Sequence, residues 1–405
     1  MKFRFIVLFL PAVFLTSPGQ SEDPSTQQLS AWLKRFPKAD ANGDGVLTAR
    51  EATDFRKTLR SKKGAKALGR GAPRQFEVDP GWEAEAFPDH AVSLRPPEEI
   101  AAIYEKVTSG KGPAVTSYEK PATGALRIVG TGHSFMAPGY RTFPVICRAS
   151  GFEQPLFTHT GGGITGSTRY KWEQENGIFE FDGKPNPKLL ASIANAEWEA
   201  MMWGPYFNDR PDYYSCWMEF CLKYNPGMKF YLSDAWPQLY QLEEKPKSED
   251  VFTPERLEQL SAERRVGYVN LVGTLREEYP DKVFILPTCD AMVLAAQHFL
   301  RGELPGIEGI HSAVGKKEER ALWRDELGHL GPGFDRLEGY VFYATLYGRS
   351  PELIEGDIDF GGSKDFPCRE LDRVFRKIAW QAVTGNQLSG VVDEDGDGLS
   401  DSRDL

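Results

Sequence analysis

The first residue that could carry out chemistry is a serine that follows a short apolar segment. Residues 127–136 read RIVGTGHSFM, so Ser134 comes directly after a predicted buried strand and a histidine. A serine hydroxyl becomes a nucleophile only when a base accepts its proton, an acid orients that base and N–H donors stabilise the oxyanion. The alternative is an ordinary loop serine that caps the next element. The rest of the chain must therefore supply the other groups.

Six histidines are available as the base. Four of them are poor candidates. His133 adjoins the serine, His159 and His298 lie within predicted elements, and His90 precedes the folded domain. Two remain, His311 in EGIHSA and His329 in RDELGHLGPG. The acid would then be Asp325 or Glu326 for His329, and Glu308 for His311. The residues alone leave these pairings open.

The elements that must position these groups alternate between short apolar runs and longer amphipathic runs. Strands are predicted over residues 125–130, 155–160, 196–203, 228–233 and 282–288. Helices are predicted over 211–224, 254–279, 290–302, 333–348 and 368–384. This alternation favours a parallel sheet covered on both faces, in which sites form at the carboxyl ends of strands. Ser134, the glycines after residue 160 and Asn208 follow the first three strands, so we expect them at one edge.

In this arrangement residues 121–350 resemble the SGNH hydrolases, or GDSL-type esterases and lipases. In that family a serine follows the first strand, a glycine the second and an asparagine the third, and an Asp and a His share a late loop. The resemblance implies a flavodoxin-like three-layer α/β/α fold with a parallel sheet. It also implies roles for individual residues: Ser134 as nucleophile, His329 as base, Asp325 as the acid that orients the base, and Gly162 or Gly163 together with Asn208 as oxyanion donors.

Three features depart from the family pattern. The family's GDS core reads Gly132-His133-Ser134, so the aspartate before the serine is absent. Gly204 lies four residues before Asn208 instead of two, and an Asn-Asp turn that caps the following helix is an alternative there. Three residues separate Asp325 from His329 where the family has two, whereas Glu326 has the family's spacing. These departures leave open a domain that has lost catalysis.

The segment DANGDGVLTARE at 40–51 matches a twelve-residue EF-hand loop position by position. Calcium needs oxygen ligands at these offsets and a glycine at the sharp turn, here Gly45, while Leu47 is the apolar anchor. The predicted ligands are Asp40, Asn42, Asp44, the backbone carbonyl of Val46, Thr48 and Glu51. Helices over 27–39 and 50–61 would flank the loop. The alternative is an acidic turn without metal.

A second Asp-rich segment, DEDGDGLSDSRD, covers residues 393–404. It resembles the calcium loops of thrombospondin type 3 and dockerin modules, with Gly398 at the turn. Its predicted ligands are Asp393, Asp395, Asp397, Asp401 and Asp404. Ser400 stands at the apolar position and Asp404 replaces the closing glutamate. A solvated acidic tail is the alternative, and no catalytic metal is expected.

The amino-terminal residues MKFRFIVLFLPAVFLTSPGQS have the basic start, apolar stretch and small residues of a secretory signal. We therefore expect a secreted or periplasmic protein without stable membrane insertion after cleavage. The predicted divisions are a signal peptide (1–20), an EF-hand segment (21–61), a basic and irregular linker (62–120), the hydrolase-like domain (121–350) and a carboxyl-terminal helix with the Asp-rich tail (351–405). The five cysteines form no CxxC pair, and most are expected to be buried and inert.

The function that these features favour is a secreted serine esterase that hydrolyses a small-molecule or polysaccharide ester and binds calcium. The net charge of −10 makes nucleic acid an unsuitable partner. Acetylated carbohydrate is the substrate class suggested by export and by the family resemblance. One alternative is an extracellular calcium-binding scaffold with an inactive hydrolase-like domain. Another is carbohydrate binding without turnover, through Trp172, Trp203 and Trp236, although packing in the core or at its rim is the favoured interpretation of these tryptophans.

Overall fold

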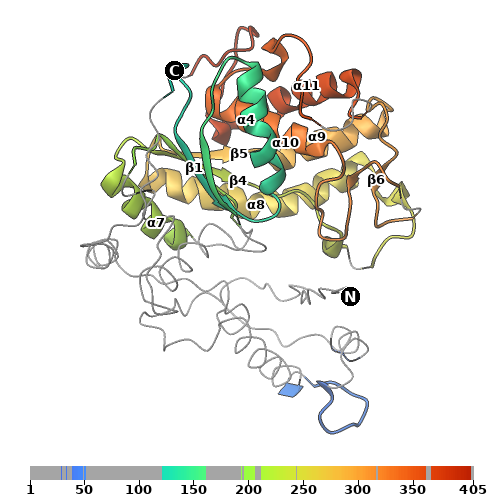
Figure 1. Cartoon of the computed structure of the whole chain (residues 1–405). Helices are drawn as coiled ribbons and strands as arrows, with labels where there is room; N and C mark the ends of the chain where they lie inside the picture. The colour runs from blue at the N-terminus through green and yellow to red at the C-terminus, as the bar shows by residue number, and fades with distance from the viewer. Residues whose placement is uncertain are drawn as a thin grey trace, which may run out of the picture. The chain divides into compact units, whose positions relative to one another are not determined.

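The computed structural model describes two parts of the chain, and each is treated by itself. The described residues are 29, 33, 39–48, 50, 51, 121–160, 193, 196–205, 211–242, 244–315, 318–361 and 366–402 (Figure 1). Those up to residue 51 belong to one compact unit, and those from residue 121 onward belong to the other. The predicted signal peptide and the predicted linker lie outside the described residues.

The larger unit is built on a sheet of five parallel strands in the order β2-β1-β3-β4-β5. The strands are β1 (Ile128–Gly132), β2 (Leu156–Thr160), β3 (Ala200–Trp203), β4 (Lys229–Ser233) and β5 (Val283–Leu286). Each neighbouring pair is parallel, and β1 places Ile128 opposite Leu156 on one side and Ala200 on the other. This order is that of flavodoxin-like sheets, so the predicted fold class is confirmed.

Helices cover both faces of this sheet. They are α4 (Ala137–Ala149), α7 (Pro211–Tyr224), α8 (Pro254–Glu278), α9 (Thr288–Leu300), α10 (Phe334–Tyr347) and α11 (Arg369–Gly385). Figure 1 shows α4, α10 and α11 above the sheet and α7 and α8 below it. Short 3-10 helices lie between them: η3 (Leu239–Gln241), η4 (Glu249–Val251), η5 (Pro351–Leu353) and η6 (Gln387–Ser389).

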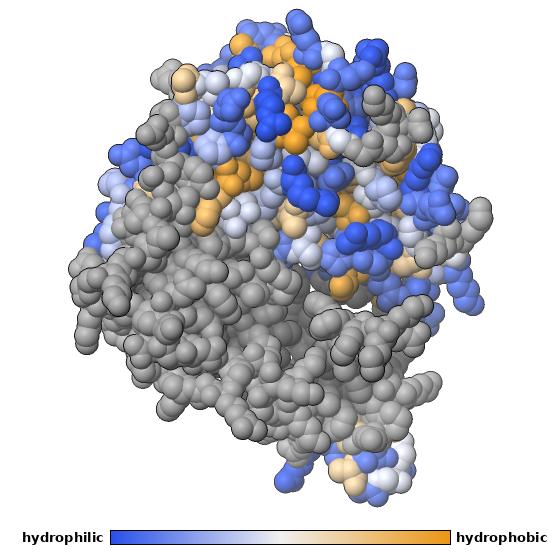
Figure 2. Space-filling model, viewed as in Figure 1, coloured by the Kyte–Doolittle hydropathy of each residue, from blue (hydrophilic) through white to orange (hydrophobic). Residues whose placement is uncertain are grey.

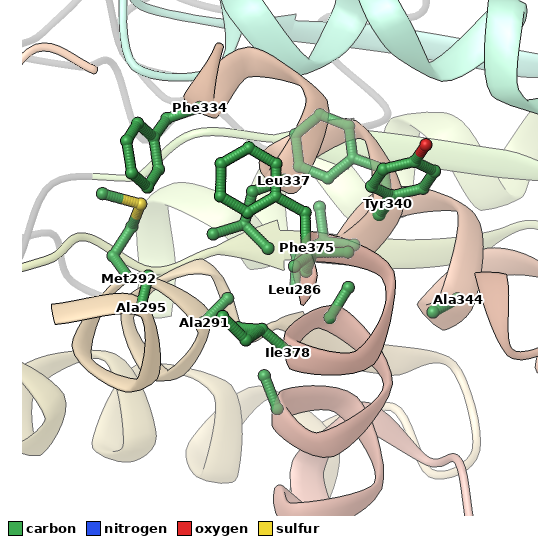
Figure 3. Close-up of a cluster of buried hydrophobic side chains, with 14 of the residues drawn as sticks. Leu286, Ala291, Met292, Ala295, Phe334, Leu337, Tyr340, Ala344, Phe375 and Ile378 are labelled. Carbon is green, nitrogen blue, oxygen red and sulfur yellow. The ribbon is translucent and has the colours of Figure 1, made fainter. Parts of the chain in front are cut away.

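The main core lies between the sheet and the layer that holds α9, α10 and α11. Figure 3 shows Leu286 of β5 among apolar side chains from these three helices. Phe334 and Phe375 are fully buried, with ring centroids 5.0 Å apart. Burying a side chain of this size contributes roughly 1.5–3 kcal/mol. The amphipathic pattern over 333–348 and 368–384 therefore predicted both the helices and the face that they bury.

Helix α4 was missing from the sequence-based assignment, because its sequence has poor helix propensity. Pro138 and Gly139 lie in its first turn, and Pro144 lies in its interior. Packing overrides this preference: α4 lies against α10, and a Cβ at Gly139 or Gly339 would overlap the facing helix. The two glycines therefore allow the close approach of α4 and α10. The Gly139 N–H also donates to the buried Glu338 carboxyl (2.6 Å).

Two short strands were also missed, and predicted boundaries of β1, β3 and β5 were wrong by two to four residues. Strands β6 (Gly309–His311) and β7 (Ala321–Trp323) pair in parallel as a separate small sheet. Three residues are too few for a periodic pattern to be recognised. Strand β1 continues two residues beyond the predicted 125–130, and β3 covers only the second half of 196–203.

The described surface is mainly polar. Hydrophilic residues cover most of the coloured surface in Figure 2, and apolar residues show in smaller groups. None of the described helices combines the length and apolarity that a bilayer span requires.

Four of the five cysteines have described side chains, and these four are free thiols. Cys147, Cys221 and Cys289 are buried, and Cys368 is half-buried. Burial raises the pKa of the three buried thiols well above the usual value, which makes them poor nucleophiles. The expectation of buried, inert cysteines is confirmed for these three.

Candidate active site

Ser134 lies in the turn between β1 and α4, at the carboxyl edge of the sheet, and is exposed. The turn is held by its neighbour His133, whose Nδ1 accepts the Phe135 N–H (3.3 Å) and whose carbonyl accepts the Met136 N–H (3.1 Å). His133 itself is buried, with 7% of its surface exposed. The histidine that replaces the family's aspartate therefore fixes the turn through acceptor atoms and leaves the serine facing outward.

The backbone before the serine is also closely packed. Gly132 has a φ of +152°, and a Cβ there would come within 2.9 Å of the Met136 sulfur. A larger residue would have to move the Met136 side chain, its Cβ would lie 3.3 Å from the Gly204 backbone nitrogen, and it would be strained at this φ. The sharp transition from β1 to the turn thus depends on this glycine.

The Ser134 hydroxyl meets the imidazole of His329, which lies 195 residues later in the chain. Ser134 Oγ is 2.8 Å from His329 Nε2. This is within the range in which a base can take the hydroxyl proton. The His329 side chain is only 17% exposed, so its position is restricted by its surroundings. Of the two histidines considered as base, the structure places His329 beside the serine.

Asp325 holds the opposite side of the same imidazole. His329 Nδ1 lies 2.8 Å from Asp325 Oδ2 and 3.0 Å from Oδ1. Asp325 Oδ1 also accepts the backbone N–H groups of Leu327 (3.1 Å) and His329 (3.2 Å). Partial burial tends to raise the pKa of Asp325, but the hydrogen bonds from His329 outweigh it and lower that pKa. The carboxylate is therefore ionised at neutral pH and directs the Nε2 lone pair toward the serine.

A tight turn accommodates the three residues between Asp325 and His329. The Gly328 N–H donates to the Asp325 carbonyl (2.8 Å), and the Arg324 N–H donates to the His329 carbonyl (2.8 Å). Gly328 adopts a φ of +84°, which a glycine accepts without strain. The spacing that departs from the family pattern thus still brings the carboxylate to Nδ1.

Glu326, the alternative acid, is directed elsewhere. Its carboxylate pairs with Lys245 (2.6 Å), and 65% of its side chain is exposed.

Strand β7 anchors this loop at the small second sheet. Trp323, the last residue of β7, forms an antiparallel bridge with Leu330 just after the histidine. The Gly331 N–H then donates to the Leu322 carbonyl (2.7 Å). Both ends of the Asp325–His329 loop are therefore fixed by backbone hydrogen bonds.

The rival pair of Glu308 and His311 is not formed. His311 is 2% exposed and lies between the rings of Phe252 and Trp323. Burial lowers the pKa of His311 to about 4, so the ring is neutral. Glu308 instead accepts the Arg320 N–H (3.1 Å). His311 is a buried structural histidine, and the less favoured alternative that paired it with Glu308 is not formed.

The predicted oxyanion donors Gly162, Gly163 and Asn208 lie outside the described residues, as does Trp172. Their roles remain predictions. Trp203 and Trp236, proposed as sugar-binding aromatics, have no exposed surface. They cannot form a stacking platform for a carbohydrate, and the favoured interpretation of these two residues as core packing is confirmed.

Sequence reasoning missed what Trp236 contacts. Trp236 lies three residues after the carboxyl end of β4, which is the strand next to β3. That position was the available signal, because in such a sheet every strand end on this edge points toward the site.

The first Asp-rich loop adopts a hydrogen-bond pattern centred on Asp40. Its carboxylate accepts the N–H groups of Gly43 (2.7 Å) and Gly45 (2.8 Å). Asn42 accepts the Asp44 N–H (3.0 Å), and Asp44 accepts the Val46 N–H (2.8 Å). Leu47 is buried against Ala39, as an apolar anchor requires.

The closing glutamate of this loop is also tied in. Glu51 accepts both the N–H (3.0 Å) and the hydroxyl (2.7 Å) of Thr48. These bonds lower the pKa of Glu51. The predicted ligand residues thus belong to one folded loop.

The second loop repeats the pattern at the same offsets. Asp393 accepts the N–H groups of Gly396 (2.9 Å) and Gly398 (3.3 Å), and Asp395 accepts the Asp397 N–H (3.1 Å). Carboxylate oxygens of Asp393, Asp395 and Asp401 lie within 4.8 Å of one another. Such a group of oxygens suits a calcium ion, whose ligands lie about 2.3–2.6 Å away. Asp404 lies outside the described residues.

Comparisons with known proteins give only distant similarity. No family model matches the chain, and no curated protein matches it. Among solved structures, a Streptococcus pneumonia protein provisionally described as a platelet activating factor shares 12% identity at a TM-score of 0.30, over 63% of this chain and 94% of its own. The periplasmic domain of a lipopolysaccharide acetyltransferase from Salmonella ser. Paratyphi A shares 12% identity at a TM-score of 0.31, over 61% of this chain and 97% of its own.

Proposed function

We propose that the chain is a serine esterase of the SGNH type. The observation that carries the proposal is the continuous hydrogen-bonded chain from Ser134 Oγ through the His329 imidazole to the Asp325 carboxylate. Its three members come from two loops far apart in sequence, and the exposed serine can meet a substrate. The alternative of an ordinary capping serine does not account for a histidine-carboxylate pair directed at its hydroxyl.

The residues act in the order that their geometry gives. Ser134 Oγ attacks the ester carbonyl while His329 Nε2 accepts its proton. The protonated imidazole then returns that proton to the leaving alcohol, and water repeats the sequence to release the acid. Asp325 keeps the Nδ1–H tautomer and stabilises the imidazolium. Gly162, Gly163 and Asn208 are the proposed donors to the oxyanion.

The proposed setting is outside the cytoplasm, and the proposed substrate is an ester on extracellular material such as acetylated carbohydrate. Support comes from the signal-like amino terminus of the sequence and from the exposed position of Ser134. A small-molecule ester is the simpler test substrate, because turnover at Ser134 can be measured without knowing the natural acyl and alcohol groups.

A fluorophosphonate probe tests the proposal directly. Such a probe reacts with a serine whose hydroxyl is activated by a base, so we expect covalent labelling of the purified protein and recovery of the label on the peptide that contains Ser134. Ser134→Ala should remove the label. Ser150→Ala is the matched control, because that hydroxyl donates to the Cys147 carbonyl (2.9 Å). An unlabelled wild-type protein of native fold would contradict the esterase assignment and favour a non-catalytic domain.

We also propose that the two Asp-rich loops bind calcium in a structural role. The support is the shared hydrogen-bond pattern, in which the first aspartate of each loop accepts the N–H groups of the fourth and sixth positions. This function alone would remain if the hydrolase-like domain proved inactive.

Calcium titration of loop variants measures this second function. We expect two sites by isothermal titration calorimetry, one lost in Asp40→Ala and the other in Asp393→Ala, since each substitution removes the first ligand of one loop. The dissociation constants should fall in the range of about 10⁻⁴–10⁻³ M typical of extracellular modules. Glu394→Gln is a charge control, because position two of the loop supplies no ligand. Isotherms that are the same in all three variants would contradict calcium binding at these loops.

A further inference from the structure

Trp236 touches both loops that bring the catalytic pair together. Its Nε1–H donates to the Gly328 carbonyl (2.5 Å), within the turn between Asp325 and His329. Its ring stacks on Phe135, the residue after Ser134, with centroids 5.0 Å apart and an angle of 23° between the planes. One fully buried side chain thus contacts the serine turn and the histidine turn at once.

Phe135 completes the connection on the serine side. Its ring lies edge to face against the His329 imidazole, with centroids 5.1 Å apart and an angle of 90°. It also contacts the His133 ring at 5.4 Å, and His133 accepts the Phe135 N–H. Rotation of the imidazole away from Ser134 would therefore have to displace the Phe135 ring.

The segment that carries Trp236 is itself firmly held at the end of β4. The buried carboxyl of Asp234 accepts the Thr288 hydroxyl (2.9 Å) and the Cys289 N–H (2.7 Å) at the start of α9. The Ser233 hydroxyl donates to the Asp234 carbonyl (3.0 Å). The backbone before Trp236 is thus attached to the sheet and to a helix, and it gives the indole a fixed base.

We propose that Trp236 is a positioning residue that holds the His329 imidazole against the Ser134 hydroxyl, through its hydrogen bond to Gly328 and its stack on Phe135. The inference rests on the proposed esterase function. Neither contact involves the serine hydroxyl itself, so Trp236 acts through the two loops. A displacement of the imidazole by about 1 Å can cost on the order of a hundredfold in rate, which makes such a support effective.

The opposing interpretation is that Trp236 is only a large core residue. Trp236→Phe separates the two, because phenylalanine keeps a ring on Phe135 but removes the donor to Gly328. Trp203→Phe is the matched control: Trp203 is equally buried and stacks on Phe230 at 5.1 Å, and among the described residues its Nε1 has no hydrogen-bond partner. Both variants replace an indole by a phenyl ring, but only Trp236→Phe removes a hydrogen bond to the histidine turn.

The test combines kinetics on p-nitrophenyl acetate with proton NMR of the full chain. In Trp236→Phe we expect kcat to fall about tenfold with KM within about twofold of wild type, because the lost bond positions the base and does not face the substrate. The far-downfield resonance of the proton between His329 Nδ1 and Asp325 should broaden or disappear. Trp203→Phe should keep both kcat and the resonance.

Two outcomes would overturn the positioning role. One is a Trp236→Phe variant with the kcat and resonance of wild type. The other is equal loss in both tryptophan variants, in step with equal falls in Tm, which would indicate core destabilisation alone. Failure of the esterase proposal is distinguishable, since wild-type turnover would then survive Ser134→Ala. The NMR measurement needs no substrate, so it tests whether Trp236 supports the histidine turn whether or not the chain is an esterase.

Discussion

Ser134→Ala and His329→Ala are each expected to lower kcat to the same floor, about 10⁴- to 10⁶-fold below wild type. The reason is the single hydrogen bond of 2.8 Å that joins the two side chains. Without the imidazole the hydroxyl keeps its proton and is a poor nucleophile, and without the hydroxyl the imidazole has nothing to activate. The measurement is steady-state hydrolysis of p-nitrophenyl acetate, with Tm recorded for each variant.

The double variant sharpens this result. Because the two residues act as one unit, Ser134→Ala combined with His329→Ala should be no slower than either single variant. His311→Gln is the histidine control: the ring is buried beside Phe252 and its Nδ1 accepts the Ala313 N–H, so it makes no contact with the Ser134 hydroxyl and kcat should stay within about threefold of wild type once folding is confirmed. If His311→Gln were the variant that abolished turnover, the assignment of the base would be wrong.

Much of the fold could be predicted because its elements carry strong periodic patterns. The apolar runs predicted all five strands of the main sheet, and the amphipathic stretches predicted α7 to α11 to within two residues of most ends. These patterns indicate which side chains of each strand or helix face the core, and burial of those apolar side chains is the dominant favourable contribution to folding. Helix α4 was not predicted because it is stabilised by packing against α10 through Gly139, and the sequence does not show that these two helices pack together.

The candidate site was predictable in its residues but not in its support. The position of Ser134 at the end of the first strand follows from topology, whereas the choice of His329 and Asp325 came from the resemblance to the SGNH pattern. Strand β7 and the Gly328 turn, which set the distance from Asp325 to His329, are too short and too irregular for any periodic pattern. Core or rim packing was the favoured interpretation of Trp236, and its buried ring agrees with that, but an isolated tryptophan after a strand does not reveal which side chains its ring contacts.

The two Asp-rich loops show the opposite case, in which spacing alone predicts local geometry. Each loop places glycine at its fourth and sixth positions, and all four glycines have positive φ values between 74° and 82°. The first aspartate can then reach two backbone N–H groups in succession. Local side-chain to backbone bonds of this kind need no tertiary partner, so the sequence is sufficient to specify them.

Asp325→Asn is expected to lower kcat by about 10³- to 10⁴-fold while leaving the fold intact. An asparagine has the same shape, and its amide oxygen can still accept the Leu327 and His329 backbone N–H groups. What it loses is the negative charge that holds a proton on Nδ1. The amide N–H₂ can instead donate to Nδ1, which favours the tautomer with hydrogen on Nε2, and that nitrogen then cannot accept the Ser134 proton.

Glu326→Gln is the matched control for this substitution, because it makes the same chemical change one residue later in the same turn. Glu326 is exposed and pairs only with Lys245 across the surface, and such pairs contribute about 0–1 kcal/mol to stability. We expect its kcat to stay within about twofold of wild type. The comparison also decides between the two acids that sequence spacing left open: a large loss in Glu326→Gln with little change in Asp325→Asn would mean that the turn rearranges in solution to present the glutamate. The bidentate contact of Asp325 with Nδ1, at 2.8 and 3.0 Å, makes the reverse order the expected one.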